Sequence, residues 1–299
     1  MQKRVFLRSA FALAAALTAT PFLAACGKAD EKAPAAASNA SGAAKPAADA
    51  AKAAAPQKVK VAVTAGPHAD IVTKAAEVAK KNGLEVEVVE FTDYITPDTA
   101  LAEKQLDIAV YQHEPFLQNF NRQKGTNLVV AAKAVVQPMG LYSNKIHALD
   151  AIPEGAKVAI PNDPSNGGRA IILLEKAGLI KVKEGAPALP TVHDVAENPK
   201  KLQLVELEAA QLPISISDLD IACVPMNYAV SGGLDVKKQG FYFESFDAPF
   251  ALIIIAARPD NVESDAVKAF VKSYQSPEVA EFIRGKFNGQ ILPAWEAQK

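Results

Sequence analysis

The composition of this chain changes abruptly near residue 57, and this change limits where a folded structure can form. Residues 27–57 contain 15 Ala and 3 Pro and contain no Leu, Ile, Val or aromatic residue. Such a segment cannot bury enough apolar surface to offset the entropy lost on ordering. We therefore expect a disordered tether over residues 26–57. The globular fold should lie in residues 58–299, which suffice for one large domain or two modest ones.

The segment before the tether has the three-part layout of an export signal. Three basic residues precede a mostly apolar run over residues 10–19, which is too short for a membrane span. Leu-Ala-Ala-Cys-Gly at residues 23–27 is similar to a bacterial lipobox, in which the thiol is acylated, as with palmitate, and the chain is cut before it. We expect residues 1–25 to be a signal peptide and Cys26 to anchor the protein to a membrane of the cell envelope, facing the periplasm or extracytoplasmic side. The alternative is a soluble export signal in which Cys26 is incidental.

The cysteines and the charge restrict the chemistry of the globular part. If Cys26 is lipidated, Cys223 has no partner for a disulfide, and its apolar surroundings favour an inert buried thiol over a reactive one. Residues 58–299 carry 25 basic and 30 acidic residues, a formal charge of −5, without a basic run. Nucleic acid is therefore not an expected partner.

Short β-rich runs alternate with helical segments along residues 58–299. Strands are expected at residues 58–63, 85–91, 106–110, 128–136, 157–160, 202–206, 221–224 and 251–256. This alternation predicts an α/β fold of mainly parallel sheets with helices on both faces.

Two apolar segments, residues 139–143 and 251–256, divide this pattern into two sets of β-α units. We interpret them as crossings between two lobes. Lobe 1 is then residues 58–140 plus 250–299, and lobe 2 is residues 141–249. Ligands of such folds bind at the carboxyl ends of the strands, which predicts a cleft between the lobes.

The most distinctive loop follows the strand expected at residues 157–160. Pro-Asn-Asp-Pro-Ser-Asn-Gly-Gly-Arg-Ala at residues 161–170 leads into a helix expected from residue 167. Helix N-terminal N–H groups bind anions, and the Arg169 guanidinium is a planar fork that fits a carboxylate. Asn166 offers both a donor and an acceptor, as the two ends of an amino acid require. We expect both residues to bind a ligand; the alternative is that Arg169 pairs with a neighbour such as Glu175.

Aromatic and polar residues gather where two other expected strands run into loops. Tyr94 follows one of them, and Tyr111 and His113 lie two residues apart just after the other. Aromatic side chains can form an apolar box there, while hydroxyl and imidazole groups orient a ligand. Taken alone, Phe91 and Phe116 favour core packing, and His113 is equally consistent with a structural role and a ligand contact.

These segments carry a family resemblance. Over residues 58–295 the chain is similar to the methionine-binding lipoproteins of ABC importers, the NlpA lipoprotein family, and the motif at residues 161–170 is highly specific. The other matching segments are Thr-Ala-Gly-Pro-His at 64–68, Phe-Thr-Asp-Tyr at 91–94, Gln-His-x-Pro at 112–115, Pro-Met-Gly-Leu-Tyr-Ser at 138–143 and Glu-Leu-Glu-Ala-Ala-Gln-Leu-Pro at 206–213.

The resemblance implies a two-lobed fold like that of type II periplasmic binding proteins. It also implies capture of methionine, or a closely related amino acid or derivative, for an ABC permease and its ATPase. By this resemblance, Tyr94, Tyr111 and His113 would line a box for the ligand side chain. Asn166 and Arg169 would hold the α-carboxylate, and Asn227 would reach the ligand from the second lobe.

One position departs from the family pattern. Pro225 stands where relatives commonly have an Asn that contacts the polar end of the ligand. Proline has neither a side-chain amide nor an N–H, so one hydrogen bond is lost unless Asn227 or water replaces it. Another amino acid or a dipeptide is therefore an alternative to methionine.

Two other classes of protein fit the sequence less well. A lyase could use His113 and Glu114 as acid and base, but adjacent residues of an extended chain point in opposite directions. A metal-import protein would need converging ligands, whereas His68, His113, His147 and His193 are scattered along the chain. We therefore expect no catalytic residue, no metal and no cofactor.

Overall fold

The structure of this chain is a computed structural model that describes residues 57–296. The expected signal peptide, Cys26 and all but the last residue of the expected tether lie outside the described residues, so these stay predictions. Within the described part of the chain, no helix has both the length and the apolar character needed to cross a bilayer.

Six strands form the first sheet, in the order β13-β4-β12-β3-β1-β2. The sheet is mixed, because β1 pairs in parallel with β2 and β3 while the other three pairings are antiparallel. The bounds are β1 (Gln57–Thr64), β2 (Leu84–Phe91), β3 (Ile108–His113), β4 (Val129–Val136), β12 (Leu252–Ala257) and β13 (Leu292–Pro293).

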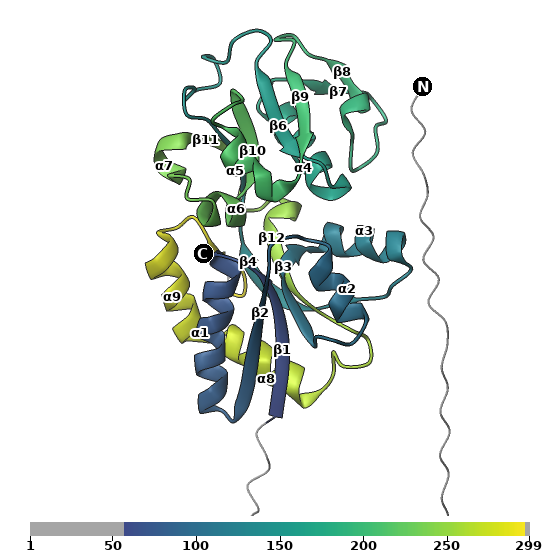
Figure 1. The fold of residues 1–299 in the computed structure, drawn as a ribbon, viewed down its shortest axis with the longest axis vertical. Helices are drawn as coiled ribbons and strands as arrows, with labels where there is room; N and C mark the ends of the chain where they lie inside the picture. Colours follow the sequence, from purple (N-terminus) through teal and green to yellow (C-terminus); the bar gives the residue numbers. More distant parts are fainter. Residues whose placement is uncertain (1–56, 297–299) are drawn as a thin grey trace, which may run out of the picture. The chain divides into compact units, whose positions relative to one another are not determined.

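Helices cover both faces of this sheet (Figure 1). One face packs on α1 (Pro67–Lys81), α8 (Asp265–Tyr274) and α9 (Pro277–Phe287), and the other on α2 (Thr96–Ala102) and α3 (Glu114–Lys124). Side chains alternate between the two faces of a strand, so Val61 and Val63 join the core beneath α1 while Ala62 joins the core beneath α2 and α3. Burial on both faces explains why β12 reads as a continuous apolar run.

Five strands form the second sheet, in the order β11-β5-β10-β6-β9. β6 pairs in parallel with β9 and β10, whereas β5 pairs antiparallel with β10 and β11. The bounds are β5 (Met139–Tyr142), β6 (Lys157–Pro161), β9 (Gln203–Leu207), β10 (Ile221–Pro225) and β11 (Gly240–Phe243). The elements around this sheet are α4 (Pro164–Lys176), α5 (Leu212–Ser215), α6 (Met226–Ser231), α7 (Val236–Gln239) and the small pair β7 (Lys181–Val182) and β8 (Val195–Glu197).

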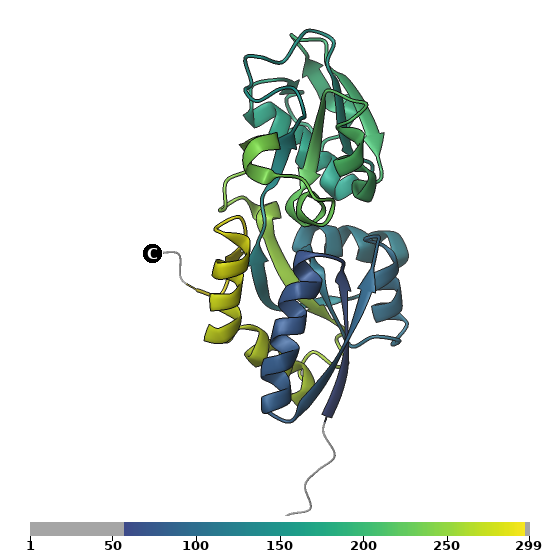
Figure 2. The same ribbon diagram turned by 60° about the vertical axis from the view of Figure 1, so that its left-hand side comes forward.

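We call the first sheet with its helices the first lobe and the second sheet with its helices the second lobe; Figure 2 shows them one above the other. Three expectations need correction. Neither sheet is mainly parallel, because strands that enter from the other lobe pair antiparallel. Residues 251–256 are not a crossing; all but Ala251 belong to β12 inside the first sheet, where burial on both faces requires apolar residues. Met139 and Gly140 lie in the second sheet, so the chain changes sheets at residues 137–138.

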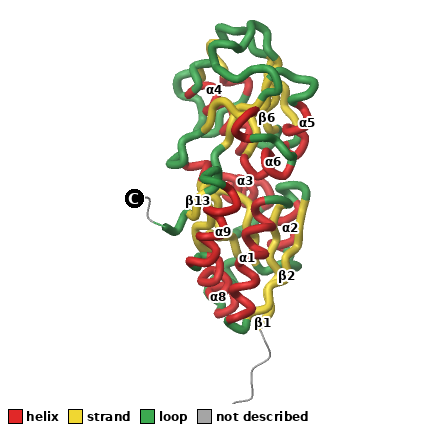
Figure 3. Tube along the Cα trace, turned by 90° about the vertical axis from the view of Figure 1, so that its left-hand side faces the viewer, coloured by secondary structure: helices red, strands yellow, loops and turns green. Residues whose placement is uncertain are grey.

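The two lobes are in direct contact in this structure. Figure 3 shows α6 of the second lobe and α3 of the first at the level where the lobes meet. Gly66, just before α1, has a φ of 91°, and a Cβ built there would lie 2.7 Å from Cβ of Ser231 at the end of α6. Only glycine allows both this conformation and this approach between the lobes.

Candidate functional site

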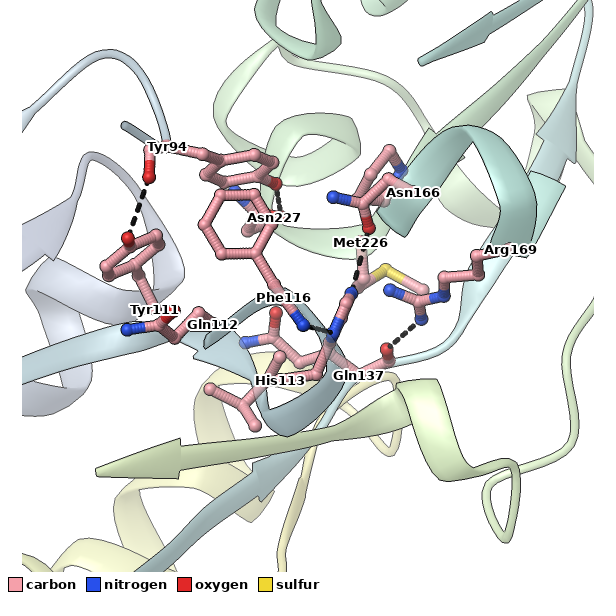
Figure 4. Close-up of a pocket in the computed structure, with 12 residues that line it drawn as sticks. Tyr94, Tyr111, Gln112, His113, Phe116, Gln137, Asn166, Arg169, Met226 and Asn227 are labelled. Carbon is pink, nitrogen blue, oxygen red and sulfur yellow. Dashed lines mark hydrogen bonds between the residues drawn. The ribbon is translucent and has the colours of Figure 1, made fainter. Parts of the chain in front are cut away.

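A pocket lies where the two lobes meet, and it brings together all six residues that the resemblance assigned to the ligand (Figure 4). Tyr94, Tyr111 and His113 come from the first lobe, and the other three come from the second. The predicted lining residues are Tyr94, Tyr111, His113, Asn166, Arg169 and Asn227, and those that the sequence did not assign are Gln112, Phe116, Gln137, Pro225, Met226 and Ile253.

Aromatic rings form the wall that the first lobe contributes. The Tyr94 ring stacks on Tyr111 with their centroids 5.8 Å apart and meets the edge of Phe116 at the same distance. The Tyr111 hydroxyl donates to the carbonyl oxygen of Tyr94 at 2.7 Å, which fixes the loop after β2 against β3. Phe116 packs in this core and also lines the pocket.

The sequence predicted that Tyr111 and His113 lie in a loop, but both lie in β3. β3 continues through His113 because Ile253 of β12 pairs with it in the antiparallel ladder. His113 is therefore held in a buried strand, whereas Glu114 begins α3 with an exposed side chain. The two residues proposed for a lyase point into different environments.

A chain of hydrogen bonds runs from His113 into the second lobe (Figure 4). His113 caps α3, and its Nδ1 accepts from the N–H of Phe116 at 3.1 Å, so the proton of the neutral ring is on Nε2. Nε2 donates to Asn166 Oδ1 at 3.1 Å, and Asn166 Nδ2 donates to the Asp163 carboxylate at 3.0 Å. Burial, with a smaller contribution from the Arg169 charge, lowers the pKa of His113 to about 3. The ring therefore stays neutral near pH 7.

α4 begins earlier than the sequence predicted, and this places Asn166 and Arg169 inside the helix. Asp163 is its N-cap, because its Oδ1 accepts from the N–H of Asn166 at 2.9 Å, and Pro164 is the first helical residue. The prediction of a helix start at residue 167 is wrong because it relied on the two glycines. Asn166 and Arg169 are three residues apart, so they share one face of the helix, which faces the pocket.

Arg169 makes a buried ion pair that the sequence did not indicate. Its Nε donates to Glu244 at 2.9 Å and its Nη2 donates to the same carboxylate at 2.6 Å and to the carbonyl oxygen of Gln137 at 3.0 Å. The side chains of Arg169 and Glu244 are 3% and 6% exposed. The alternative pairing with Glu175 is wrong, since Glu175 accepts from the N–H of Val182 instead.

Glu244 and Gln137 both lie where the chain passes between the lobes. Gln137 follows β4 and Glu244 follows β11, where its Oε2 also accepts from the N–H of Met139 at 2.8 Å. The only sequence signals were a polar residue inside an apolar run and an acid after Phe-Tyr-Phe. Neither signal identifies a partner of Arg169, because Gln137 and Glu244 are 32 and 75 residues away from it along the chain.

Asn227 contacts the first lobe from α6. The Tyr94 hydroxyl donates to Asn227 Oδ1 at 2.8 Å, and Asn227 Nδ2 lies 3.5 Å from Thr64 Oγ1. The neighbouring Tyr228 hydroxyl donates to the carbonyl oxygen of Thr92 at 2.9 Å. Pro225 ends β10 and lines the pocket without an N–H to offer.

A second buried carboxyl lies beside the aromatic wall, and the sequence gave no indication of it. Asp98, in the first turn of α2, accepts from Gln112 Nε2 at 2.6 Å. Burial raises the pKa of Asp98 to about 7, and the hydrogen bond from Gln112 opposes this rise only partly, since the second carboxyl oxygen has no hydrogen-bond partner among the described residues. Among residues 57–296, Asp98 has no cation within salt-bridge distance.

Two other expectations concern reactive groups outside the pocket. Cys223 lies in β10 with no exposed surface, and burial raises the pKa of its thiol, which confirms a buried residue. In the part of the chain that the structure describes, no three His, Cys, Asp or Glu side chains gather as a metal site would require.

The sequence of this chain is similar to those of known binding lipoproteins. The sequence model of the family described as NlpA lipoprotein matches residues 59–295. The D-methionine-binding lipoprotein MetQ of Escherichia coli O157:H7 is 44% identical over 243 residues, which are 80% of this chain and 89% of that protein. The protein of the same name from Yersinia pestis is 44% identical over 244 residues, 81% of this chain and 90% of its own length.

Solved structures of binding proteins are similar to this chain in fold as well as in sequence. A nutrient binding protein from Burkholderia cenocepacia bound to methionine superimposes with a TM-score of 0.77 at 43% identity, covering 79% of this chain and 100% of that one. The methionine binding protein MetQ gives a TM-score of 0.77 at 42% identity, covering 81% of this chain and 99% of that one. These structures confirm the two-lobed fold of the binding proteins.

Proposed function

This chain belongs to the NlpA lipoprotein family, and from that premise we propose that it is the substrate-binding lipoprotein of an ABC importer. Its ligand is methionine or a closely related amino acid. Relatives at 44% identity are D-methionine-binding lipoproteins, and a structural neighbour at 43% identity is bound to methionine. In this proposal Cys26 carries the lipid anchor, and the protein delivers its ligand to an ABC permease and its ATPase on the extracytoplasmic side.

The pocket supports an amino-acid ligand because its two walls differ in chemistry. One wall is aromatic, and aromatic rings make favourable contacts with a thioether sulfur as well as with other apolar side chains. The other wall is polar and is formed by residues of α4 and α6 together with Gln137, which lies between β4 and β5. The single observation that carries the proposal is that all six ligand-binding residues implied by the family line one pocket between the two lobes.

The polar wall also favours a ligand without net charge. Arg169 is neutralised by Glu244, and His113 stays neutral because its pKa is about 3. A zwitterion adds no net charge to such a pocket, whereas an anion or a cation would be buried without a full counter-charge.

Native mass spectrometry and calorimetry test this function. Freshly purified protein should retain one ligand of the mass of methionine, and stripped protein should bind L- or D-methionine more tightly than leucine. Binding should raise the thermal unfolding temperature, because the ligand binds only the folded state. Tighter binding of a methionyl dipeptide would favour the dipeptide alternative. Binding of none of these ligands would contradict the proposal.

A further inference from the structure

The ion pair between Arg169 and Glu244 leaves the ligand carboxylate short of donors. A guanidinium usually holds a carboxylate through two parallel N–H groups. Here Nε and Nη2 of Arg169 are already bonded to Glu244, and Nη2 is also bonded to the carbonyl oxygen of Gln137. Only Nη1 has no hydrogen bond to another described residue, so a second donor must come from elsewhere in the pocket.

Gln137 is placed to supply that donor. Gln137 is 2% exposed and lines the same pocket. Its Nε2 is buried and has no hydrogen-bond partner among the described residues. A buried donor without an acceptor is rare in native structures because it loses its hydrogen bonds to water and gains none. An unpaired amide inside a ligand pocket therefore points to an acceptor on the ligand.

The backbone of Gln137 fixes the position of this amide beside the guanidinium. Its N–H donates to the carbonyl oxygen of Ala251 at 2.7 Å, and its carbonyl oxygen accepts from Arg169 Nη2 at 3.0 Å. The residue is thus held on both sides at the point where the chain leaves β4 for the second lobe. A carboxylate that reaches Nη1 of Arg169 lies within the same polar wall as the Gln137 side chain.

We infer that Gln137 determines specificity for a free α-carboxylate, with its Nε2 donating to the carboxylate oxygen next to the one that Arg169 Nη1 binds. This inference rests on the proposed function, since it presumes an amino-acid ligand. It adds a residue that neither the sequence motifs nor the family resemblance assigned. It also defines the ligand class as amino acids with an unmodified carboxylate, because an ester or an alcohol cannot accept a charge-assisted bond there.

Two substitutions distinguish the possible partners of this amide. Calorimetry with L-methionine at pH 8 compares the parent with Gln137→Leu, which removes the donor, and Gln137→Glu, which places a second negative charge by the ligand carboxylate. We expect binding to weaken about tenfold in Gln137→Leu and by a further tenfold or more in Gln137→Glu. Gln123→Glu makes the same change in net charge on the exposed side of α3 and should bind like the parent.

The decisive result is which of the two Gln137 variants binds L-methionine more weakly. If the amide instead accepts a bond from the ligand ammonium group, Gln137→Glu binds as tightly as the parent or more tightly, and the inference is overturned. L-methioninol, which lacks the carboxylate, should bind the parent and Gln137→Leu within about threefold of each other. An equal loss for methioninol would show a structural role and would also overturn it. If the parent binds neither methionine enantiomer, the proposed function itself fails. If the parent binds methionine and both Gln137 variants bind it equally tightly, the proposed function stands and this inference is wrong.

Discussion

The two walls of the pocket are built in opposite ways. The aromatic wall is held by neighbours in its own lobe, since the rings of Tyr94, Tyr111 and Phe116 contact one another and the Tyr111 hydroxyl fixes the Tyr94 backbone. The polar wall depends on groups far away along the chain, because Arg169 is held by Glu244 and by the carbonyl oxygen of Gln137. Both of these partners lie where the chain passes between the lobes.

The two walls also treat a buried carboxyl differently. Glu244 behind the polar wall has a guanidinium partner, and its charge is compensated. Asp98 beside the aromatic wall has only the amide of Gln112 as a side-chain hydrogen-bond partner among the described residues, and burial raises its pKa to about 7. The comparison indicates that the polar wall is stabilised by charge pairing, whereas the aromatic wall tolerates a carboxyl that is protonated below neutral pH.

The largest expected effect is on the charge pair. Arg169→Ala should lower the free energy of unfolding of the ligand-free protein by about 3–5 kcal/mol, because it leaves the Glu244 carboxylate buried without a counter-charge. We also expect the variant to bind methionine more weakly. Urea unfolding monitored by circular dichroism measures the first effect, and calorimetry measures the second.

A double substitution is the matched control for this prediction. Arg169→Met combined with Glu244→Leu removes both charges and keeps most of the volume, so it should recover most of the lost stability while binding stays weak. If Arg169→Ala unfolds at the parent's urea concentration, the pair does not hold the polar wall. The difference between the two walls would then be one of ligand contacts alone.

A smaller effect is expected at Asp98. Its pKa is about 7 in the folded chain against an ordinary value of 3.8, so the folded state binds more protons and stability falls as pH rises through this window. Between pH 5 and pH 8 this loss is on the order of 2–3 kcal/mol. Asp98→Asn cannot ionise and keeps an oxygen for Gln112, so it should lack this part of the pH dependence.

The measurement is the difference in unfolding free energy between Asp98→Asn and the parent at pH 5 and at pH 8. Histidine titrations occur in both proteins and cancel in this difference. The variant should gain stability over the parent at pH 8 relative to pH 5. A difference that does not change with pH would mean that Asp98 finds a cation or water that the described residues do not provide.

The same contrast explains what the sequence could predict. Periodicity located most strands to within a few residues, because local patterning reports burial directly. It could not assign strand direction, since a central antiparallel strand such as β12 is as apolar as a parallel one. It also placed Tyr111 and His113 after a strand, because the pairing that extends β3 comes from Ile253, 140 residues away along the chain.

The site was predicted unevenly for the same reason. Motifs identified six residues that do line one pocket, although their roles in binding stay predictions. The sequence did not reveal three residues whose importance comes from tertiary structure. Gln137 links the lobes, Glu244 pairs with an arginine of another element, and Asp98 is buried completely. A single sequence contains no local signal for such contacts.

The smallest expected effect concerns His113, which joins the two walls. Its Nδ1 accepts a backbone N–H and its Nε2 donates to Asn166, so protonation would break the first bond and bury a charge near Arg169. Its pKa of about 3 keeps the ring neutral, and the affinity for methionine should change by less than twofold between pH 5.5 and pH 8. The Asp98→Asn variant is the proper background, since it removes a buried carboxyl whose pKa of about 7 lies in this range. NMR of the ring should show no titration of His113 above pH 5. A tenfold fall in affinity on acidification, with a matching midpoint in the His113 resonance, would show that this link between the walls is a charged one.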